Sequence, residues 1–391
     1  MASFACGCQD IPYTEQIPKV QRRMDHQDAD ARTVNSPSRM TRLPTLRGRG
    51  VTPNPASRFE RITMERDPST LVEDPDPKTQ FFKDSTRSII ARNTSPDVGF
   101  DLSINPYRGC EHGCAYCYAR PTHEYLGLSA GLDFESKIFI KEDASKLLRD
   151  ELSSPRWQPK LLALSGVTDP YQPVERTARV TRGCLEVLAE FRNPVMVITK
   201  NFLVTRDLDL LAKLASHGAA KVAISLTTLD RSLQRVMEPR TSSPARRLDA
   251  IEKLSQAGVP VAVFLAPLIP GLNDHEIPSI LEAAADRGAT EASCVPLRLP
   301  YGVKDIFLDW LERHVPDRKE KIVNRILAMR GGRLNDPNLV SRMKGRGPMA
   351  EQVMQLFHVA RRKAGLDGPA VELSTAAFRR PGDVIQLTLG V

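Results

Sequence analysis

The sequence has 391 residues, of which 41% are hydrophobic and 26% charged, and its net charge is +8. No run of residues approaches the roughly 18 consecutive apolar positions that a membrane helix needs, and residues 1–10 lack the basic and apolar regions of a secretory signal. From these features we expect neither a membrane protein nor a secreted one. We therefore expect a soluble, cytoplasmic protein of two or three domains, counting roughly 150 residues per domain.

The first 100 residues predict little regular structure. They contain ten prolines and few sustained apolar patterns, so they cannot bury enough apolar surface to offset the entropy of ordering. We expect residues 1–57 to form a disordered tail and residues 58–100 to form an extended, partly docked arm. Cys6 and Cys8 lie in this tail without further ligands nearby, and we assign them no metal.

Residues 101–300 alternate between short β-branched runs and amphipathic helical patterns. After a short strand at 102–105, the expected strands are 136–141, 160–165, 195–199, 221–226, 259–265 and 291–296. The expected helices between them include 177–191, 207–217, 244–257 and 274–287. This alternation is typical of a parallel sheet with right-handed crossovers, and six or so units are too few for an eightfold barrel. We predict an α/β fold, a partial (β/α)6 TIM-like barrel, with its chemistry at the C-terminal ends of the strands.

Residues 301–391 predict a helical C-terminal region packed on the barrel. Helical patterns occupy 304–315, 318–329, 336–343 and 349–364. From residue 297 onward there are 17 basic and 10 acidic side chains, a net charge of +7, whereas residues 101–296 are nearly neutral. Such a region is either a polyanion-binding surface or a solvated helical face, so DNA is a candidate partner.

Three cysteines, Cys110, Cys114 and Cys117, give the strongest signal in the sequence. Their C-x3-C-x2-C spacing lies in the first strand-to-helix loop, where Gly109 and Gly113 allow the chain to wrap around one point. Soft thiolates select zinc, copper(I) or iron–sulfur clusters. Three thiolates on a [4Fe–4S] cluster leave one iron open, which is the interpretation we favour. The alternative is a zinc site that takes His112 or His123 as its fourth ligand, and Cys184 and Cys294 are expected in the core.

The cysteine spacing, the aromatic residue before the last cysteine, and the βα repeats resemble the radical S-adenosylmethionine (SAM) superfamily. Within it, three motifs resemble the spore photoproduct lyase-like branch, whose members are often labelled DNA repair photolyases: Asn105-Pro106-Tyr107-Arg108-Gly109-Cys110, Thr168-Asp169-Pro170-Tyr171-Gln172-Pro173-Val174-Glu175 and Glu238-Pro239-Arg240-Thr241. The resemblance covers roughly residues 80–360.

This resemblance implies an enzyme with a [4Fe–4S] cluster and SAM as cofactors. In the family, SAM chelates the open iron, and one electron cleaves it to methionine and a 5′-deoxyadenosyl radical that abstracts a substrate hydrogen. It also implies a one-electron reductant of the flavodoxin or ferredoxin type. The expected lyase-like chemistry leaves the substrate open, with nucleic acid among the candidates.

Several residues are candidates for contact with SAM by their positions after the strands. For most of them a structural role is also open: Thr168 and Asp169 can form an ordinary turn, and Lys200 can be solvated. For Asn273 the neighbouring Asp274 also fits a plain helix N-cap. The cofactor candidates are Tyr116, Gly166, Thr168, Asp169, Lys200, Ser225 and Asn273.

The hydrogen-donating cysteine of spore photoproduct lyase has no counterpart in Ser165-Gly166-Val167, so thymine-dimer repair is not carried over. Tyr116 and Tyr118 are candidates for supplying a hydrogen or relaying an electron. The competing hypothesis is a non-catalytic, metal- or cluster-containing nucleic-acid-binding protein.

Overall fold

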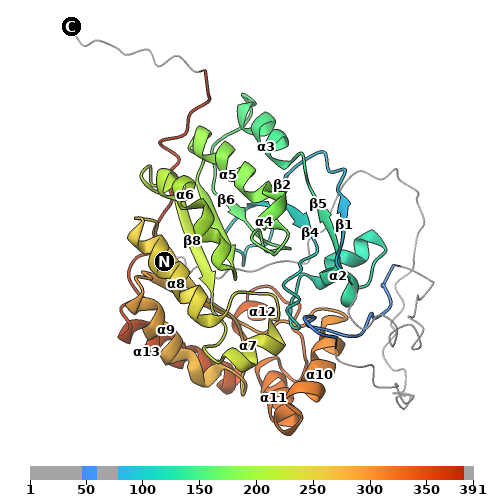
Figure 1. Ribbon diagram of the computed structural model, residues 1–391. Coiled ribbons are helices and arrows are strands. Elements are labelled where there is room, and N and C mark those ends of the chain that lie inside the picture. The colour runs from blue at the N-terminus through green and yellow to red at the C-terminus, as the bar shows by residue number, and fades with distance from the viewer. Residues whose placement is uncertain (1–45, 60–77, 383–391) are drawn as a thin grey trace.

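A computed structural model describes residues 46–59 and 78–382 (Figure 1). Its main sheet has seven strands in the order β10-β9-β8-β7-β6-β3-β2. Six of them pair in parallel, and β2 (Ile90–Arg92) runs antiparallel at one edge. The parallel strands are β3 (Leu102–Ile104), β6 (Leu162–Leu164), β7 (Val195–Thr199), β8 (Ala220–Ser225), β9 (Val261–Leu268) and β10 (Glu291–Pro296). The predicted partial (β/α)6 barrel is confirmed.

Helices follow the parallel strands and cover the outer face of the curved sheet (Figure 1). They are α3 (Ala144–Ser153), α5 (Val180–Phe191), α6 (Leu208–Ala215), α8 (Pro244–Gln256) and α9 (Ile277–Asp286). Two short helices, α4 (Glu175–Ala178) and α7 (Arg231–Met237), lie in the segments that follow β6 and β8. Three 3-10 helices, η1 (Arg120–Leu126), η2 (Phe202–Asp207) and η3 (Asp274–Glu276), occupy loops at the C-terminal side of the strands.

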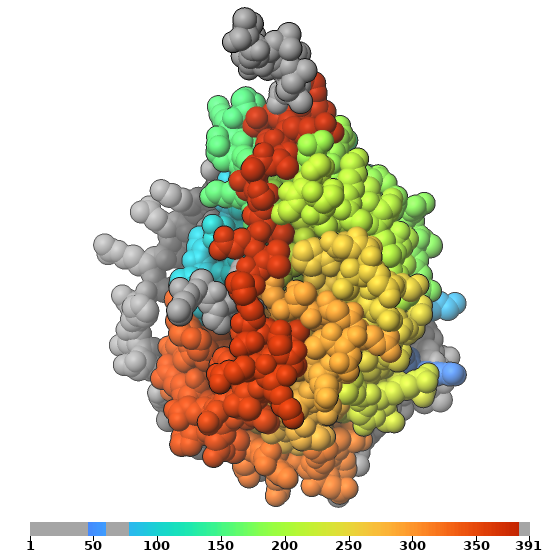
Figure 2. Space-filling view, turned by 90° about the vertical axis from the view of Figure 1, so that its left-hand side faces the viewer, coloured from blue at the N-terminus to red at the C-terminus, as the bar shows by residue number. Residues whose placement is uncertain are grey.

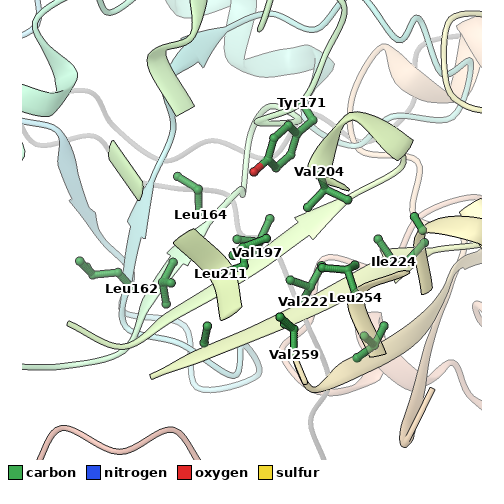
Figure 3. Packing of buried hydrophobic residues seen from close by; sticks show 14 of the residues in the cluster. Leu162, Leu164, Tyr171, Val197, Val204, Leu211, Val222, Ile224, Leu254 and Val259 are labelled. Carbon is green, nitrogen blue, oxygen red and sulfur yellow. The ribbon is translucent and has the colours of Figure 1, made fainter. Parts of the chain in front are cut away.

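The core lies between the outer face of the sheet and these helices. Leu162, Val197 and Val222 project from neighbouring strands toward Leu211 and Leu254 of the helices (Figure 3). These side chains are fully buried, and burial of each apolar side chain contributes roughly 1.5–3 kcal/mol. Because this face is packed, the opposite, inward side of the strand ends is where space remains for ligands.

The strand expected at 136–141 does not join the main sheet, which corrects that part of the prediction. It is β5 (Lys137–Ile140), the middle strand of a separate sheet with β1 (Gln80–Lys83) and β4 (Tyr107–Arg108). The short helix α2 (Leu132–Ser136) precedes it. Directly after β4 the chain enters the loop that carries the three cysteines, residues 109–117 (the cysteine loop), so this small sheet lies next to that loop in the sequence.

The C-terminal region packs as four helices, α10 (Val303–His314), α11 (Pro316–Met329), α12 (Ser341–Lys344) and α13 (Gly347–Lys363). The helix expected at 336–343 is mostly absent, because the Asp336 carboxylate instead closes a turn, accepting hydrogen bonds from Asn338 N at 2.9 Å and Ser341 Oγ at 2.7 Å. After α13, residues 364–382 contain no helix and run as a band over the surface, drawn in red in Figure 2.

Residues 1–45 of the expected disordered tail, with Cys6 and Cys8, lie outside the described residues, as do 60–77 and 383–391. Residues 46–57, which the sequence placed in the same tail, instead pack on the barrel with Leu46 and Val51 buried. Val51 belongs to the same hydrophobic cluster as Cys114 and Ala115. The other domain boundaries stay predictions. In the part of the chain that the structure describes, no helix has the length and apolar character needed to cross a lipid bilayer.

Candidate functional site

A cavity opens at the C-terminal ends of the parallel strands. Its wall is made by the cysteine loop and by residues that end or follow β6, β7, β8, β9 and β10. The cavity has a volume of about 150 Å³. Of the predicted site residues, those in its wall are Cys110, Cys114, Tyr116, Cys117, Tyr118, Gly166, Thr168, Asp169, Lys200 and Ser225.

The cysteine loop makes two consecutive turns that present its three thiols to the cavity. Gly113 N donates to Cys110 O at 3.4 Å, and Cys117 N donates to Cys114 O at 3.2 Å. Gly113 has a φ of 65°, a left-handed conformation that favours glycine. The two turns, the first of which contains Gly113, therefore bring cysteines that are four and three positions apart to one wall.

Glu135 holds this loop from behind. Its carboxylate is fully buried and accepts hydrogen bonds from Gly50 N at 3.1 Å and Val51 N at 3.2 Å. Arg120, also fully buried, donates to Cys114 O at 3.0 Å and lies 3.7 Å from Glu135. The segment 46–57 thus forms part of the cysteine-loop support, which sequence reasoning missed.

The three thiols have raised pKa values because they are buried. Burial is the largest effect on the pKa of Cys110, Cys114 and Cys117, and neighbouring carboxylates and thiols raise those of Cys110 and Cys114 further. Within the described ranges, no three His, Cys, Asp or Glu side chains converge as the ligands of a single metal ion do.

The Asp169 side chain connects the cysteine loop to the end of β7. Its carboxylate accepts hydrogen bonds from Thr199 Oγ1 at 2.7 Å and from Lys200 N at 2.8 Å, and it lies 3.3 Å from Nδ1 of the buried His112. Burial alone would raise the pKa of Asp169, but His112, Thr199 and the Lys200 amide hold it below its usual range. Asp169 therefore stays ionised while positioning its neighbours.

Thr168 and Gly166 connect the turn after β6 to the same loop. The Thr168 hydroxyl donates to Gly109 O at 2.7 Å, so it supports the residue that precedes the first cysteine. Gly166 has a φ of 136° and approaches the Asn105 side chain. Its carbonyl oxygen accepts a hydrogen bond from the Tyr118 hydroxyl at 2.5 Å.

Glu238 interacts with two cationic side chains and a tyrosine hydroxyl next to the cavity. It is fully buried, pairs with Arg247, and accepts a hydrogen bond from the Tyr116 hydroxyl. Lys200 Nζ lies 3.4 Å from Glu238 and donates to Ala266 O at 3.0 Å. Burial would raise the pKa of Glu238, but Arg247 and Lys200 lower it well below its usual range. Lys200 is thus held in place rather than solvated.

Asn273 is not in the cavity wall. Its side chain accepts from Ile269 N at 2.7 Å and donates to Thr227 O at 2.8 Å and Pro267 O at 3.1 Å. The amide is therefore used to hold the loop after β9, and the structure does not bring Asn273 together with the other predicted residues.

Neither candidate histidine is placed as a spare fourth ligand. His112 lines the cavity but is bracketed by Asp169 and by Asn201 Nδ2 at 3.3 Å. His123 lies outside the wall, where burial lowers its pKa to about 4 and its Nε2 is 3.0 Å from Lys137 O.

Arg298 is a residue of the site that sequence reasoning missed. It is the second residue after β10, lines the cavity, and its guanidinium lies 5.8 Å from the centre of the Tyr118 ring. Its position directly after the last strand was the available signal.

Residues 104–284 match the family model of the radical SAM superfamily. An uncharacterized protein of Mycobacterium tuberculosis is 37% identical over 220 residues, which make up 56% of this chain and 65% of that protein. A radical SAM Nα-GlyT isomerase of Pseudomonas phage M6 is 24% identical over 211 residues, covering 54% of this chain and 42% of the phage protein. The chain thus spans less than two thirds of these relatives.

Solved structures show the same fold. A mutant of spore photoproduct lyase with bound AdoMet (SAM) and dinucleoside spore photoproduct aligns with a TM-score of 0.51 at 15% identity. The alignment covers 72% of this chain and 78% of the lyase.

Proposed function

The chain belongs to the radical SAM superfamily, which uses a [4Fe–4S] cluster and SAM, and on this premise we propose that it abstracts hydrogen atoms from a nucleotide-containing substrate. When bound, the two cofactors supply one-electron cleavage of SAM and a 5′-deoxyadenosyl radical. The observation that carries the proposal is that three cysteines, Lys200 and Arg298 share one cavity at the C-terminal ends of the strands.

Cys110, Cys114 and Cys117 are the proposed cluster ligands. Their buried thiols ionise only when a cation compensates the charge, and iron supplies that compensation. Thiols that face one cavity without converging on a single ion suit a cluster, in which each thiolate binds a different iron atom. The same arrangement disfavours zinc, as do the engaged His112 and the remote His123.

Lys200, Ser225 and the Tyr116 ring are the proposed SAM contacts. Lys200 offers an ammonium to the carboxylate of SAM, and Glu238 and Ala266 O fix that ammonium at the cavity wall. Thr168 and Asp169 act as positioning residues, because their side chains are committed to Gly109, Lys200 N and Thr199. Gly166 leaves room where its backbone borders the cavity.

Arg298 and Tyr118 form the proposed substrate side. Arg298 supplies a cation for a phosphate, and the Tyr118 ring supplies a face for a base. A nucleotide unit meets both requirements, and spore photoproduct lyase, whose fold this chain shares, binds a dinucleoside. Apolar side chains between the strand ends, Phe100, Ile198, Phe264 and Val295, complete the wall and exclude water from a reactive radical.

Anaerobic reconstitution with iron and sulfide tests the cofactor assignment. We expect three to four irons per chain, and 5′-deoxyadenosine that forms only with a reductant such as dithionite or reduced flavodoxin. The variant with Cys110, Cys114 and Cys117 changed to alanine loses both, whereas Cys184→Ala, which alters a core cysteine, keeps them. One zinc per chain and no SAM cleavage would support the non-catalytic alternative.

Gel-shift titration with single- and double-stranded DNA tests the substrate class. We expect binding that weakens steeply between 50 and 200 mM salt, because neutralised phosphates release counterions, and that weakens further in Arg298→Gln. A shift that is absent or insensitive to salt contradicts the nucleotide proposal and leaves the cofactor assignment standing.

A further inference from the structure

A second cavity lies at the opposite, N-terminal end of the barrel. Its wall includes first or second residues of the strands, among them Met196, Lys221, Ala262 and Glu291. Its volume is about 450 Å³, compared with about 150 Å³ for the first cavity. Phe100, Ile198 and Phe264 line both cavities and separate them.

The barrel is hollow here because small residues occupy inward positions of the strands. Ala223 of β8, Ala262 of β9 and Ser293 of β10 face this cavity. In (β/α) barrels these layers are usually filled by bulky branched side chains. The space that remains is bounded mainly by apolar groups.

Helix α13 and the chain after it form the floor. Met354, Phe357, His358 and Arg361, which share one face by their spacing, line the cavity. Beyond the helix, Val371 N donates to Glu291 Oε1 at 2.7 Å, Ser374 N to Gly218 O at 2.8 Å and Arg379 N to Phe191 O at 2.9 Å. Figure 2 shows this segment in red as a continuous band.

Charge at the second cavity is concentrated at its mouth and is mostly positive. Inside, Lys221 Nζ and Glu291 Oε2 are 2.6 Å apart, so this buried pair is neutral as a whole. At the mouth, two cationic side chains, Lys344 and Arg361, accompany one carboxylate, Asp367. Arg361 Nε donates to Leu366 O at 2.9 Å, which fixes the guanidinium there.

From this combination of an apolar interior and a cationic mouth, we propose that the second cavity binds an amphipathic anion, an apolar chain with a terminal carboxylate. The chain lies against Ala223, Ala262 and Phe357, where its burial is favourable. The carboxylate meets Arg361, which offers a planar pair of donors to such a group. No residue of this site belongs to the proposed cluster or SAM contacts, although Phe100, Ile198 and Phe264 line both cavities, so ligand binding here can be tested separately from SAM cleavage.

Isothermal titration calorimetry of the full-length reconstituted protein with decanoate tests the proposal. We expect one binding site, and at least tenfold weaker binding in Arg361→Gln. The matched control Arg362→Gln changes an exposed arginine of the same helix that does not line the cavity, and its affinity stays unchanged. Absence of decanoate binding, or equal affinities of the two variants, overturns the proposal.

A second variant tests the interior without altering charge. In Ala262→Leu the larger side chain fills the hollow, so decanoate binding is lost while the cluster absorbance and circular dichroism are retained. Full affinity in a folded Ala262→Leu protein would place the ligand elsewhere and overturn the assignment. Should this variant fail to fold, the arginine pair alone decides the question.

Discussion

Gly50 lies directly against the carbonyl oxygen of Gly113, and a Cβ atom built on Gly50 would stand 1.4 Å from that oxygen. The contact joins the segment 46–57 to the cysteine loop, and Glu135 bonds to the amides of Gly50 and Val51 at the same place. No side chain fits between the two backbones. The cysteine loop is therefore supported by a segment that lies some sixty residues earlier in the sequence.

We expect Gly50→Ala to displace this segment and weaken cluster retention. Overpacking of this kind costs about 1–3 kcal/mol, and the loss falls on the cysteine loop. The measurement is the rate at which the absorbance of the reconstituted iron–sulfur cluster, at about 400 nm, disappears in the presence of a chelator. Gly302→Ala is the control, because its Cβ meets no atom closer than 3.9 Å. Equal bleaching rates would contradict the prediction.

Asp169→Asn is expected to reduce reductant-dependent formation of 5′-deoxyadenosine at least tenfold while iron content stays at the wild-type level. An asparagine carries an NH2 group in place of one carboxylate oxygen. This group cannot act as the acceptor that Thr199, Lys200 N and His112 face in the wild-type protein. The comparison is with Asp209→Asn, which alters an exposed carboxylate on α6. Loss of iron together with activity would instead assign Asp169 to loop stability alone.

Lys200→Met is expected to weaken SAM binding at least tenfold, a change of about 1.4 kcal/mol. The ammonium is lost from the cavity wall, and Glu238 keeps Arg247 as its partner. Lys200→Arg should restore part of the affinity, and the exposed Lys213→Met should leave it unchanged. Equilibrium dialysis with labelled SAM measures all three. Unchanged affinity in Lys200→Met would remove Lys200 from the SAM contacts.

Asp97→Asn is expected to lower stability at pH 7 but to have little effect in acid. Arg342 donates to both oxygens of Asp97 at 2.7 Å, and it lowers the pKa of this carboxyl below its usual range despite burial. Because this carboxyl group has a lower pKa in the folded state, its ionised form stabilises the fold at pH values above the unfolded-state pKa of about 3.9. This stabilisation is lost as the pH falls through the folded-state pKa. We expect about 2 kcal/mol at pH 7.

Thermal unfolding of both proteins at pH 7, 5 and 3 measures this difference. The gap between the two midpoints should be constant from pH 7 to 5 and shrink at pH 3. Asp101→Asn, at a nearby exposed position, provides the reference for a carboxylate on the surface. A gap that is the same at every pH would show that the ion pair contributes nothing through its charge.

The barrel could be predicted from the sequence because its signals are local. Buried β-branched runs and amphipathic helices specify their own periods, and the strands expected at 195–199 and 291–296 have those bounds in the structure. The cysteine spacing is likewise a short-range pattern, and all three thiols reach one cavity. Local patterns therefore gave the fold class and the chemical end of the sheet.

Other features depend on which partner a segment meets, and sequence does not encode this locally. Residues 136–141 alternate between apolar and polar side chains as a strand of either sheet would. Only their pairing with β1 and β4 assigns them to the small sheet. Asn273 follows a strand as a ligand residue would, yet the backbone of Ile269 and Thr227 uses its amide. Gly50 and Arg298 gain their roles from contacts across long stretches of chain.

Phe264 lines the cavities at both ends of the barrel, as do Phe100 and Ile198. A substitution at any of these three positions therefore alters the walls of both cavities at once.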